Sequence, residues 1–486
     1  MSSCEVVFCS FEAHPFAKVG GLADVAGALP DALAEVGVNC KLIMPRFAQI
    51  DAAKFDLEPV EIPNDWYVSI RNERYPFQCW KTKTAKGAEV YFLGDEHFFG
   101  RPGIYADADG KAFPQELDRY VFFAKGCLEL VKCLGWRPDV IHSNDYQTGA
   151  IAAWVRRTYA DEQAFARTRL VYSIHNLAYQ GVYEAEAMAS MGFGSDEFEP
   201  MGPFEFHGAV NLMKIGINFA DAVNTVSPSY AREILTEAHG AGLEGVLQAA
   251  SHKLSGILNG IDTAVWNPET DPLVGSTYSL DDLSGKKEAK RALMAECDLD
   301  PSKIDRPLVG MIGRLVEQKG GDLVLPLVDD IIGHDVSLVL LGSGAADLEQ
   351  GWKDAAARHP GRLHAKIGFD EGLAHRITAG ADIFLMPSRY EPCGLNQMYA
   401  MRYGTIPVVH RTGGLADTVE EWNGEAKSGT GFLFDEPRED LLASALGRAF
   451  EVFDQGENWT RLQNNAMSKD FSWTRSAREY QQLYLG

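Results

Sequence analysis

Short apolar runs alternate with stretches of helical spacing along most of the chain. Such runs occupy residues 6–11, 140–145, 170–174 and 222–227, and later residues 307–312, 336–341, 363–369, 381–386 and 406–410. Apolar runs of this length between glycine-rich and polar turns are typical of buried parallel strands. After the first run, Leu22, Val25, Leu29 and Leu33 recur at helical spacing, with Pro30 as a candidate break in the helix. The pattern predicts an α/β protein built from strand–helix units.

The alternation pauses near residue 255 and then starts again. A chain of 486 residues exceeds what one hydrophobic core usually serves. The segment SHKLSGILNGID contains an Asn-Gly turn, marks the boundary and places Asn259 near a hinge. We expect two doubly wound, Rossmann-like domains that face a cleft, with residues 1–254 in the first and 255–471 in the second. Within the first, residues 183–207 are acidic and lack a clear period, which predicts a surface loop or lid.

Charge and cysteine content narrow the class of protein. The 45 basic and 68 acidic residues give a net charge of −23, which disfavours nonspecific binding to nucleic acid or to an anionic membrane. The 8 cysteines are scattered without a CxxC pair, which favours a reducing cytoplasm over a disulfide framework or a zinc site. The first strand pattern begins almost at once, so we expect no signal or transit peptide. No apolar run reaches the roughly eighteen residues of a membrane span.

The first candidate for chemistry is the segment KVGGLADV, residues 18–25, between the first strand and its helix. Its paired glycines, Gly20 and Gly21, let a ligand approach the backbone closely. Lys18 and the helix N-terminus supply positive potential for a phosphate. We interpret the segment as a phosphate-contacting loop; the alternative is a glycine turn beside a solvated lysine.

Two polar clusters follow neighbouring strand patterns. One strand ends in His142, Asn144 and Asp145, and the next is followed by His175, Asn176, Tyr179 and Gln180. Polar groups at the ends of two adjacent strands favour a convergent pocket, although a single histidine after a strand is more often structural. Neither cluster has the ligand spacing of a zinc site.

The second half offers cations, a glycine pair and a carboxylate at strand ends. Arg314 and Lys319 follow one strand, and Thr412, Gly413 and Gly414 follow another. Two cations with backbone donors suit a diphosphate, whereas an ion pair is the structural alternative for Arg314. Glu391 lies in a strand-to-helix loop, SRYEPCGLNQMYAM, where open α/β sheets bind ligands; the alternative is that it caps the helix. Neither half opens with G-x-G-x-x-G, which disfavours a dinucleotide oxidoreductase.

Ordered motifs along nearly the whole chain resemble those of one enzyme family. They are KVGGLADV, HNLAYQG, TVSPSYA, NGID, GRLVEQKGGDL, SRYEPCGLNQMYAMRYGTIPVV and TGGLADTV. In this order and at these separations, from about residue 5 to the end, they resemble bacterial glycogen synthases and plant starch synthases. The resemblance implies GT-B architecture and a retaining hexosyltransferase that uses ADP-glucose, without a cofactor, to extend the non-reducing end of an α-1,4-glucan. It also implies that a final helix, about residues 472–486, crosses back onto the first domain.

The resemblance assigns roles to individual residues. The expected catalytic residues are Glu391, Arg314, Lys319, His175 and Asp145. The expected substrate-binding residues are Lys18, Gly20, Gly21, Asn176, Gln180, Asn259, Phe369, Cys393, Gly394, Leu395, Thr412, Gly413 and Gly414. Arg314 and Lys319 correspond to the cations that bind the diphosphate, Asp145, His175 and Asn259 to contacts with the transferred glucose, and Glu391 to an essential carboxylate that holds sugar hydroxyls. Phe369 stands where family members often stack a tyrosine on adenine.

The expected mechanism follows from the leaving group. A nucleoside diphosphate mainly requires stabilisation of its negative charge, which Arg314 and Lys319 supply without a metal. Because no second carboxylate stands beside Glu391, unlike the pair that glycosidases use, we expect front-face displacement without an enzyme nucleophile. Closure of the cleft is expected to complete the site. Three alternatives remain, namely a UDP-glucose-dependent transferase with a small acceptor, a pyridoxal phosphate-dependent glucan phosphorylase, for which no motif is found, and a non-catalytic glucan-binding protein.

Overall fold

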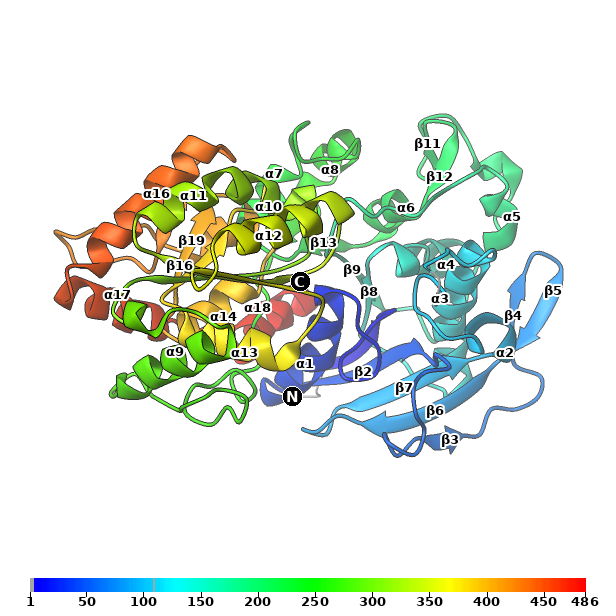
Figure 1. The fold of residues 1–486 in the computed structure, drawn as a ribbon. Helices are drawn as coiled ribbons and strands as arrows, with labels where there is room; N and C mark the ends of the chain where they lie inside the picture. Colours follow the sequence, from blue (N-terminus) through cyan, green and yellow to red (C-terminus); the bar gives the residue numbers. More distant parts are fainter. Residues whose placement is uncertain (1–3, 108–109) are drawn as a thin grey trace. The chain divides into compact units, whose positions relative to one another are not determined.

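The computed structural model describes residues 4–107 and 110–486, and the chain divides into two compact units. The first unit contains Met1–Gly260 and Trp473–Gly486, and the second contains Ile261–Ser472 (Figure 1). The sequence placed the division earlier, at residue 255. The structure differs because β14 (Leu254–Gly256) pairs with β13 (Ala222–Thr225) and so belongs to the first sheet.

A large sheet organises the first unit. Its strand order is β14-β13-β9-β8-β1-β2-β7-β6-β3. The strands from β14 to β7 pair in parallel, and β6 and β3 continue the sheet in antiparallel pairing. The remaining bounds are β1 (Cys4–Cys9), β2 (Val38–Pro45), β3 (Glu58–Val60), β6 (Gln78–Lys83), β7 (Glu89–Gly94), β8 (Val140–Asn144) and β9 (Arg169–Ile174). This order reverses direction at β1 and β8, and ligands of open α/β sheets bind at such a switch point, beyond the carboxyl ends of the strands.

Helices of the first unit form two layers. α1 (Gly21–Glu35) packs against α18 (Trp473–Leu485), while α4 (Ile151–Arg157) packs against both α3 (Glu116–Cys133) and α6 (Leu212–Phe219). Right-handed crossovers place these two groups on opposite faces of the sheet. Pro30 lies inside α1 without ending it, because Leu29 just before it and Leu33 on the following turn are fully buried.

The terminal helix α18 belongs to the core of the first unit. The hydroxyl of Tyr484 lies 2.8 Å from Nδ1 of His142 on β8, and the hydroxyl of Tyr480 accepts a 3.3 Å hydrogen bond from Asn224 on β13. Both tyrosine side chains are buried. The apolar face of the amphipathic helix α18 therefore packs on the sheet that the first 260 residues form.

The segment 183–207 is more ordered than its composition predicted. It contains α5 (Ala187–Met191) and β11 (Glu205–Phe206), which pairs with β12 (Ala209–Asn211). Met188, Met191 and Phe193 are buried in the core of the unit. The prediction of a surface loop or lid is therefore wrong for these three residues. The 5-residue helix α5 is too short for its apolar spacing to be recognised in the sequence.

The second unit contains a wholly parallel sheet of order β17-β16-β15-β18-β19-β20. Its strands are β15 (Leu308–Ile312), β16 (Ser337–Gly342), β17 (Leu363–Ile367), β18 (Ile383–Met386), β19 (Ile406–His410) and β20 (Phe432–Phe434). The helices that bear on the site are α10 (Gly321–Val324), α13 (Glu371–Gly380), α14 (Asn396–Arg402) and α15 (Gly413–Thr418). The sequence located every strand of this sheet except β20, and the doubly wound α/β fold is confirmed for this unit.

The described ranges, 4–107 and 110–486, contain neither a membrane-spanning helix nor a metal-binding cluster. No helix there is both long and apolar enough to cross a membrane. Within the same residues, no cluster of three or more His, Cys, Asp or Glu side chains is arranged to hold a metal ion.

Candidate active site

The loop that carries Lys18 is held by a buried carboxylate. Glu12, three residues after the end of β1, is 3% exposed. It accepts hydrogen bonds from the backbone N–H groups of Val19 and Gly20 and from the hydroxyl of Tyr105. Lys18 is exposed and forms an ion pair of 2.6 Å with Asp24. The sequence analysis missed Glu12, although an acidic residue shortly after a buried strand was a usable signal.

The two glycines of this loop leave space for a ligand. An added Cβ at Gly20 or Gly21 would meet no atom of the described chain within 4 Å. Gly21 begins the 15-residue helix α1, whose first N–H groups and dipole favour an anion. Internal packing therefore does not require glycine at either position, and the interpretation of the segment as a phosphate-contacting loop stays a prediction.

Asp145 and His175 lie together at the carboxyl ends of β8 and β9. The backbone N–H of His175 donates a 2.7 Å hydrogen bond to Oδ1 of Asp145. Asp145 has φ 55°, a region that non-glycine residues rarely adopt and that is found most often at functional sites. Burial raises the pKa of Asp145 from 3.8 to about 7, although the backbone N–H groups of His175 and Asn176 act in the opposite direction. The structure thus joins the two predicted clusters through Asp145 and His175. His142 of the first cluster is instead fully buried, and its Nδ1 lies 2.8 Å from the hydroxyl of Tyr484.

Gln180 and Asn259 have contrasting surroundings in the same unit. The amide nitrogen of Gln180 donates to the carbonyls of Leu177 and Ala241, and its oxygen accepts from Asn211 at 2.7 Å. The Gln180 side chain therefore stabilises the turn that runs from Leu177 to Gln180. Asn259 is 6% exposed, and its Oδ1 has no hydrogen-bond partner among the described residues. An unpartnered buried acceptor at this position suits a ligand that donates a hydrogen bond, such as a sugar hydroxyl.

In the second unit, Glu391 and Lys319 are direct partners. The ammonium of Lys319 lies 2.5 Å from Oε2 of Glu391, and the hydroxyl of Ser388 donates to the same oxygen at 3.1 Å. The Glu391 side chain is 8% exposed, whereas that of Lys319 is 23% exposed. The cation expected to meet the diphosphate and the carboxylate expected to meet the sugar are therefore adjacent. Glu391 is not a helix cap, because α14 begins only at Asn396 and Leu395 precedes it without a capping side chain.

Three glycines allow the loops of this unit to pack tightly around Glu391. A Cβ on Gly413 would lie 2.0 Å from the carbonyl oxygen of Glu391, and one on Gly414 would lie 2.1 Å from that of Cys393. The N–H of Gly414 donates to the Glu391 carbonyl at 3.1 Å. Gly394 has φ 71°, and a Cβ at this position would crowd the side chain of Gln397. The TGGL segment thus serves both as a packing surface and as the start of α15.

Arg314 and Phe369 remain available to a ligand. Arg314 is exposed, and its guanidinium donates a long hydrogen bond of 3.4 Å to the amide oxygen of Gln318. The amide nitrogen of Gln318 donates to the carbonyl of Tyr390 at 3.3 Å. Phe369, just after β17, is 89% exposed. A phenyl ring this exposed at the carboxyl edge of a parallel sheet is positioned to stack on a planar ligand.

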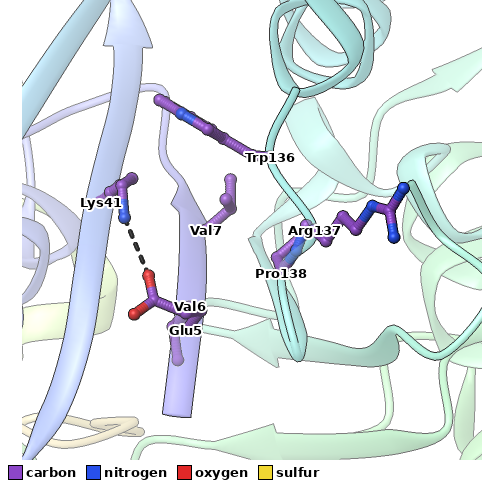
Figure 2. A pocket seen from close by; sticks show the side chains of 7 residues that line it. All are labelled: Glu5, Val6, Val7, Lys41, Trp136, Arg137 and Pro138. Atoms are coloured by element: carbon purple, nitrogen blue, oxygen red, sulfur yellow. Dashed lines mark hydrogen bonds and ion pairs between the residues drawn. The ribbon is translucent and has the colours of Figure 1, made fainter. Parts of the chain in front are cut away.

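Two cavities of the first unit lie away from these strand ends. The one in Figure 2 has a volume of about 90 Å³ and lies at the amino end of β1, where Lys41 and Glu5 form a 2.9 Å ion pair and the side chain of Arg137 points away. Its lining is Glu5, Val6, Val7, Lys41, Trp136, Arg137 and Pro138. The other, of about 410 Å³, lies beside α3 and includes Trp66, Lys125 and Tyr159. Neither contains a residue of the expected site.

Comparison with known families divides the chain at a similar place. Residues 5–249 match the starch synthase catalytic domain, and residues 300–466 match glycosyl transferases group 1.

Individual relatives match over nearly the full chain. A glycogen synthase of Anaeromyxobacter sp. (strain Fw109-5) is 46% identical over 481 residues, which cover 99% of this chain and 98% of the relative. One of Thermotoga maritima is 42% identical over 485 residues, with 99% and 98% covered. The solved catalytic domain of starch synthase IV from Arabidopsis thaliana, bound to ADP and acarbose, has a TM-score of 0.91 at 35% identity and covers 100% of this chain and 99% of its own. A sucrose-phosphate synthase from Thermosynechococcus elongatus, with a TM-score of 0.60 and 16% identity over 99% and 98% of the two chains, supports the fold alone.

The two doubly wound units and the polar residues at their strand ends define a glycosyltransferase of the GT-B class. The predicted fold class is confirmed. The chain belongs to the glycogen synthase and starch synthase family, and it is an enzyme of glucosyl transfer in glycogen or starch synthesis.

Proposed function

We propose that this enzyme transfers glucose, with retention of configuration, from ADP-glucose to the 4-hydroxyl at the non-reducing end of an α-1,4-glucan. The observation that carries the proposal is the Lys319–Glu391 pair, 2.5 Å apart, held by the Gly413–Gly414 turn at the carboxyl edge of the second sheet. A cation and a carboxylate side by side suit a ligand in which a diphosphate is joined to a sugar. The ADP and acarbose named for the starch synthase IV structure support a nucleotide and a glucan-like ligand.

The second unit binds the donor in this proposal. Lys319 and Arg314 meet the diphosphate, and the Thr412–Gly414 turn lies beside them. Phe369 stacks on the adenine, which its 89% exposure permits. Glu391 accepts hydrogen bonds from hydroxyls of the transferred glucose. Cys393, Gly394 and Leu395 shape the same loop, and Cys393 itself is buried.

The first unit supplies the remaining groups. Gly20 and Gly21 let phosphate or acceptor approach the start of α1, and Lys18 adds positive charge. Asp145, His175 and Asn259 contact the transferred glucose. The orphaned Oδ1 of Asn259 supports this assignment, because a sugar hydroxyl would satisfy it.

The chemistry is a front-face displacement. The bond from the anomeric carbon to the diphosphate breaks while the bond to the acceptor oxygen forms on the same face. The acceptor hydroxyl gives its proton to a departing phosphate oxygen, so no enzyme nucleophile is needed. Lys319 and Arg314 stabilise the negative charge that develops on the diphosphate. We propose that neither a metal nor an organic cofactor takes part, and that the enzyme works in a reducing cytoplasm without nucleic-acid or membrane partners.

The decisive experiment measures transfer of labelled glucose to glycogen from ADP-glucose and, separately, from UDP-glucose. We expect incorporation from ADP-glucose that persists in a chelator, is lost in Glu391→Ala and is retained in Glu425→Ala, which changes an exposed glutamate of the same unit. Incorporation from UDP-glucose alone would overturn the donor assignment. A covalent glucosyl adduct on Asp145 or Glu391 would overturn the front-face mechanism, and activity that requires added Mg²⁺ would overturn the metal-independent one.

A further inference from the structure

Asn144 and His175 meet at the carboxyl edge of the first sheet. Asn144 is the last residue of β8, and His175 follows β9. Figure 1 labels these two strands, which pair in parallel. The parallel register pairs Asn144 with Ser173, so His175 lies just beyond Asn144. Asn144 is fully buried and His175 is 9% exposed. Nε2 of His175 lies 2.9 Å from Oδ1 of Asn144.

The surroundings of Asn144 fix which atom its amide presents. Its Nδ2 lies 3.1 Å from the carbonyl oxygen of Cys9 on β1 and 3.4 Å from that of His142. A carbonyl oxygen only accepts hydrogen bonds, so the NH₂ group must face these two oxygens. The amide oxygen must then face the imidazole.

The amide oxygen in turn fixes the proton on the ring. Because Oδ1 of Asn144 can only accept, Nε2 of His175 must carry the hydrogen. A neutral imidazole has one N–H, so Nδ1 then carries an unshared electron pair and can only accept. This tautomer is set by a chain of contacts that begins at a backbone carbonyl of β1.

The neighbourhood of His175 favours the neutral ring. Burial lowers the pKa of His175 to about 3. Three titratable groups lie around it. Asp145 accepts the backbone N–H of His175 and not the ring, His142 lies on the neighbouring strand β8, and the charge of Glu12 acts on Asp145. Within residues 4–107 and 110–486, neither ring nitrogen of His175 forms a hydrogen bond or ion pair with a carboxylate that would stabilise an imidazolium.

We propose that Asn144 is a positioning residue that holds His175 as the neutral Nε2–H tautomer, so that Nδ1 accepts a hydrogen bond from a hydroxyl of the transferred glucose. The role of the tautomer in transfer rests on the proposed function, in which His175 contacts that glucose. His175 then acts as a fixed acceptor and takes no part as a general acid. A purely structural Asn144 would only hold the end of β8 against β1.

The tautomer is tested without any assay of activity. In protein labelled with ¹³C,¹⁵N-histidine, the signals of His175 are assigned by their loss in His175→Gln. We expect the nitrogen and carbon shifts of an Nε2–H imidazole, unchanged between pH 5.5 and 8. An Nδ1–H tautomer, or titration of the ring within this range, would overturn the proposal. This measurement needs no variant at Asn144, so misfolding of such a variant leaves the test intact.

The role in transfer is tested with two variants at Asn144. Asn144→Asp places a carboxylate against Nε2, which raises the pKa of His175 and produces an imidazolium without a free pair on Nδ1. Asn144→Leu removes the same hydrogen bonds without adding charge. We expect the turnover of Asn144→Asp relative to wild type to fall at least tenfold at pH 6 and to recover partly at pH 8.5, whereas the ratio for Asn144→Leu stays constant with pH.

The outcomes separate this inference from the proposed function. Equal, pH-independent losses in both variants would show a structural role for Asn144 and overturn the positioning role. A wild-type enzyme that transfers no glucose from any sugar nucleotide would overturn the proposed function and, with it, the role of Nδ1 in transfer. The tautomer itself would still be decided by the histidine spectra.

Discussion

Replacement of Asp145 by asparagine is expected to stabilise the protein and to inactivate it. Asp145 has a pKa of about 7 in the folded chain, because burial opposes its ionisation, against 3.8 without that effect. Between these values the folded state binds more protons than the unfolded state, so wild-type stability falls as pH rises through the window from about 4 to 7. Asn cannot ionise, and its amide oxygen can still accept the N–H of His175.

The magnitude follows from the size of the pKa difference. A difference of roughly 3 units corresponds to about 4 kcal/mol above pH 7 for a carboxyl fully removed from water. Asp145 retains part of its accessible surface, and solvent screening reduces the figure to about 2 kcal/mol. We expect Asp145→Asn to gain ~1 kcal/mol over wild type at pH 5.5 and ~2 kcal/mol at pH 8, which is a few degrees in Tm for a unit of this size.

Differential scanning calorimetry at several pH values measures this difference. The matched control is Asp161→Asn, which removes the same charge from an exposed position of the first unit and should show no pH-dependent gain. In parallel, turnover of Asp145→Asn should fall at least tenfold, because the carboxylate is expected to contact the transferred glucose. An advantage of Asp145→Asn that stays constant or shrinks between pH 5.5 and 8 would refute the reasoning.

Three further changes test other parts of the site. Lys319→Ala should raise the KM for the donor and lower kcat, together at least a hundredfold in kcat/KM. The change removes the positive charge that faces the diphosphate and leaves Glu391 without its ion-pair partner. Unchanged kinetics would make Lys319 a surface residue. Phe369→Ala should raise the donor KM about tenfold, which corresponds to ~1–2 kcal/mol of stacking. Phe369→Tyr should keep a donor KM near that of the wild type, and neither variant should alter Tm. Equal kinetics for the two variants would exclude stacking. Tyr484→Phe should lower the free energy of unfolding of the first unit by about 1 kcal/mol, because Nδ1 of the buried His142 ring loses its hydrogen-bond partner. The kinetics of the folded enzyme should stay unchanged. A calorimetric Tm equal to that of the wild type would contradict this prediction.

The arrangement around Asp145 and Glu391 gives two carboxylates different environments. Glu391 is paired with Lys319 and Ser388. Among the described residues, the carboxylate of Asp145 accepts from the backbone N–H groups of His175 and Asn176, and the residue has φ 55°. Carboxylates whose environments differ in this way can serve different roles in one reaction. The pH dependence of the stability gain in Asp145→Asn reports directly on that difference.

The amino-acid sequence by itself determined the local elements of this protein. In the second unit, β15 to β19 lie where apolar runs predicted them, because a strand buried on both faces must be almost continuously apolar. The loops after these strands were also located in advance, and with them Lys319, Glu391 and the Gly413–Gly414 turn. The ordered motifs carried the family, which the comparisons confirmed.

The sequence was less informative where burial is partial or the partner is distant. Four strands on one side of β1 were not predicted: β6 and β3 are only partly buried, whereas β2 and β7 are largely buried. β20 was missed as a short run of three residues. Residues 183–207 were taken for a surface loop or lid, because the helix that carries Met188 and Met191 has 5 residues and is too short to show a period. Pro30 failed to end α1, since local propensity yields when the flanking residues are well packed.

Only the tertiary structure decided which side chains meet. Glu12 reaches the loop of Lys18, Asn144 reaches His175 across 31 residues, and Lys319 reaches Glu391 across 72. Strand order and register set these pairs, and both depend on contacts between residues far apart in the chain. The amino-acid sequence determines which side chains stand at the end of each strand. The packing of the sheet determines which of those side chains are in contact and in which protonation state they are held.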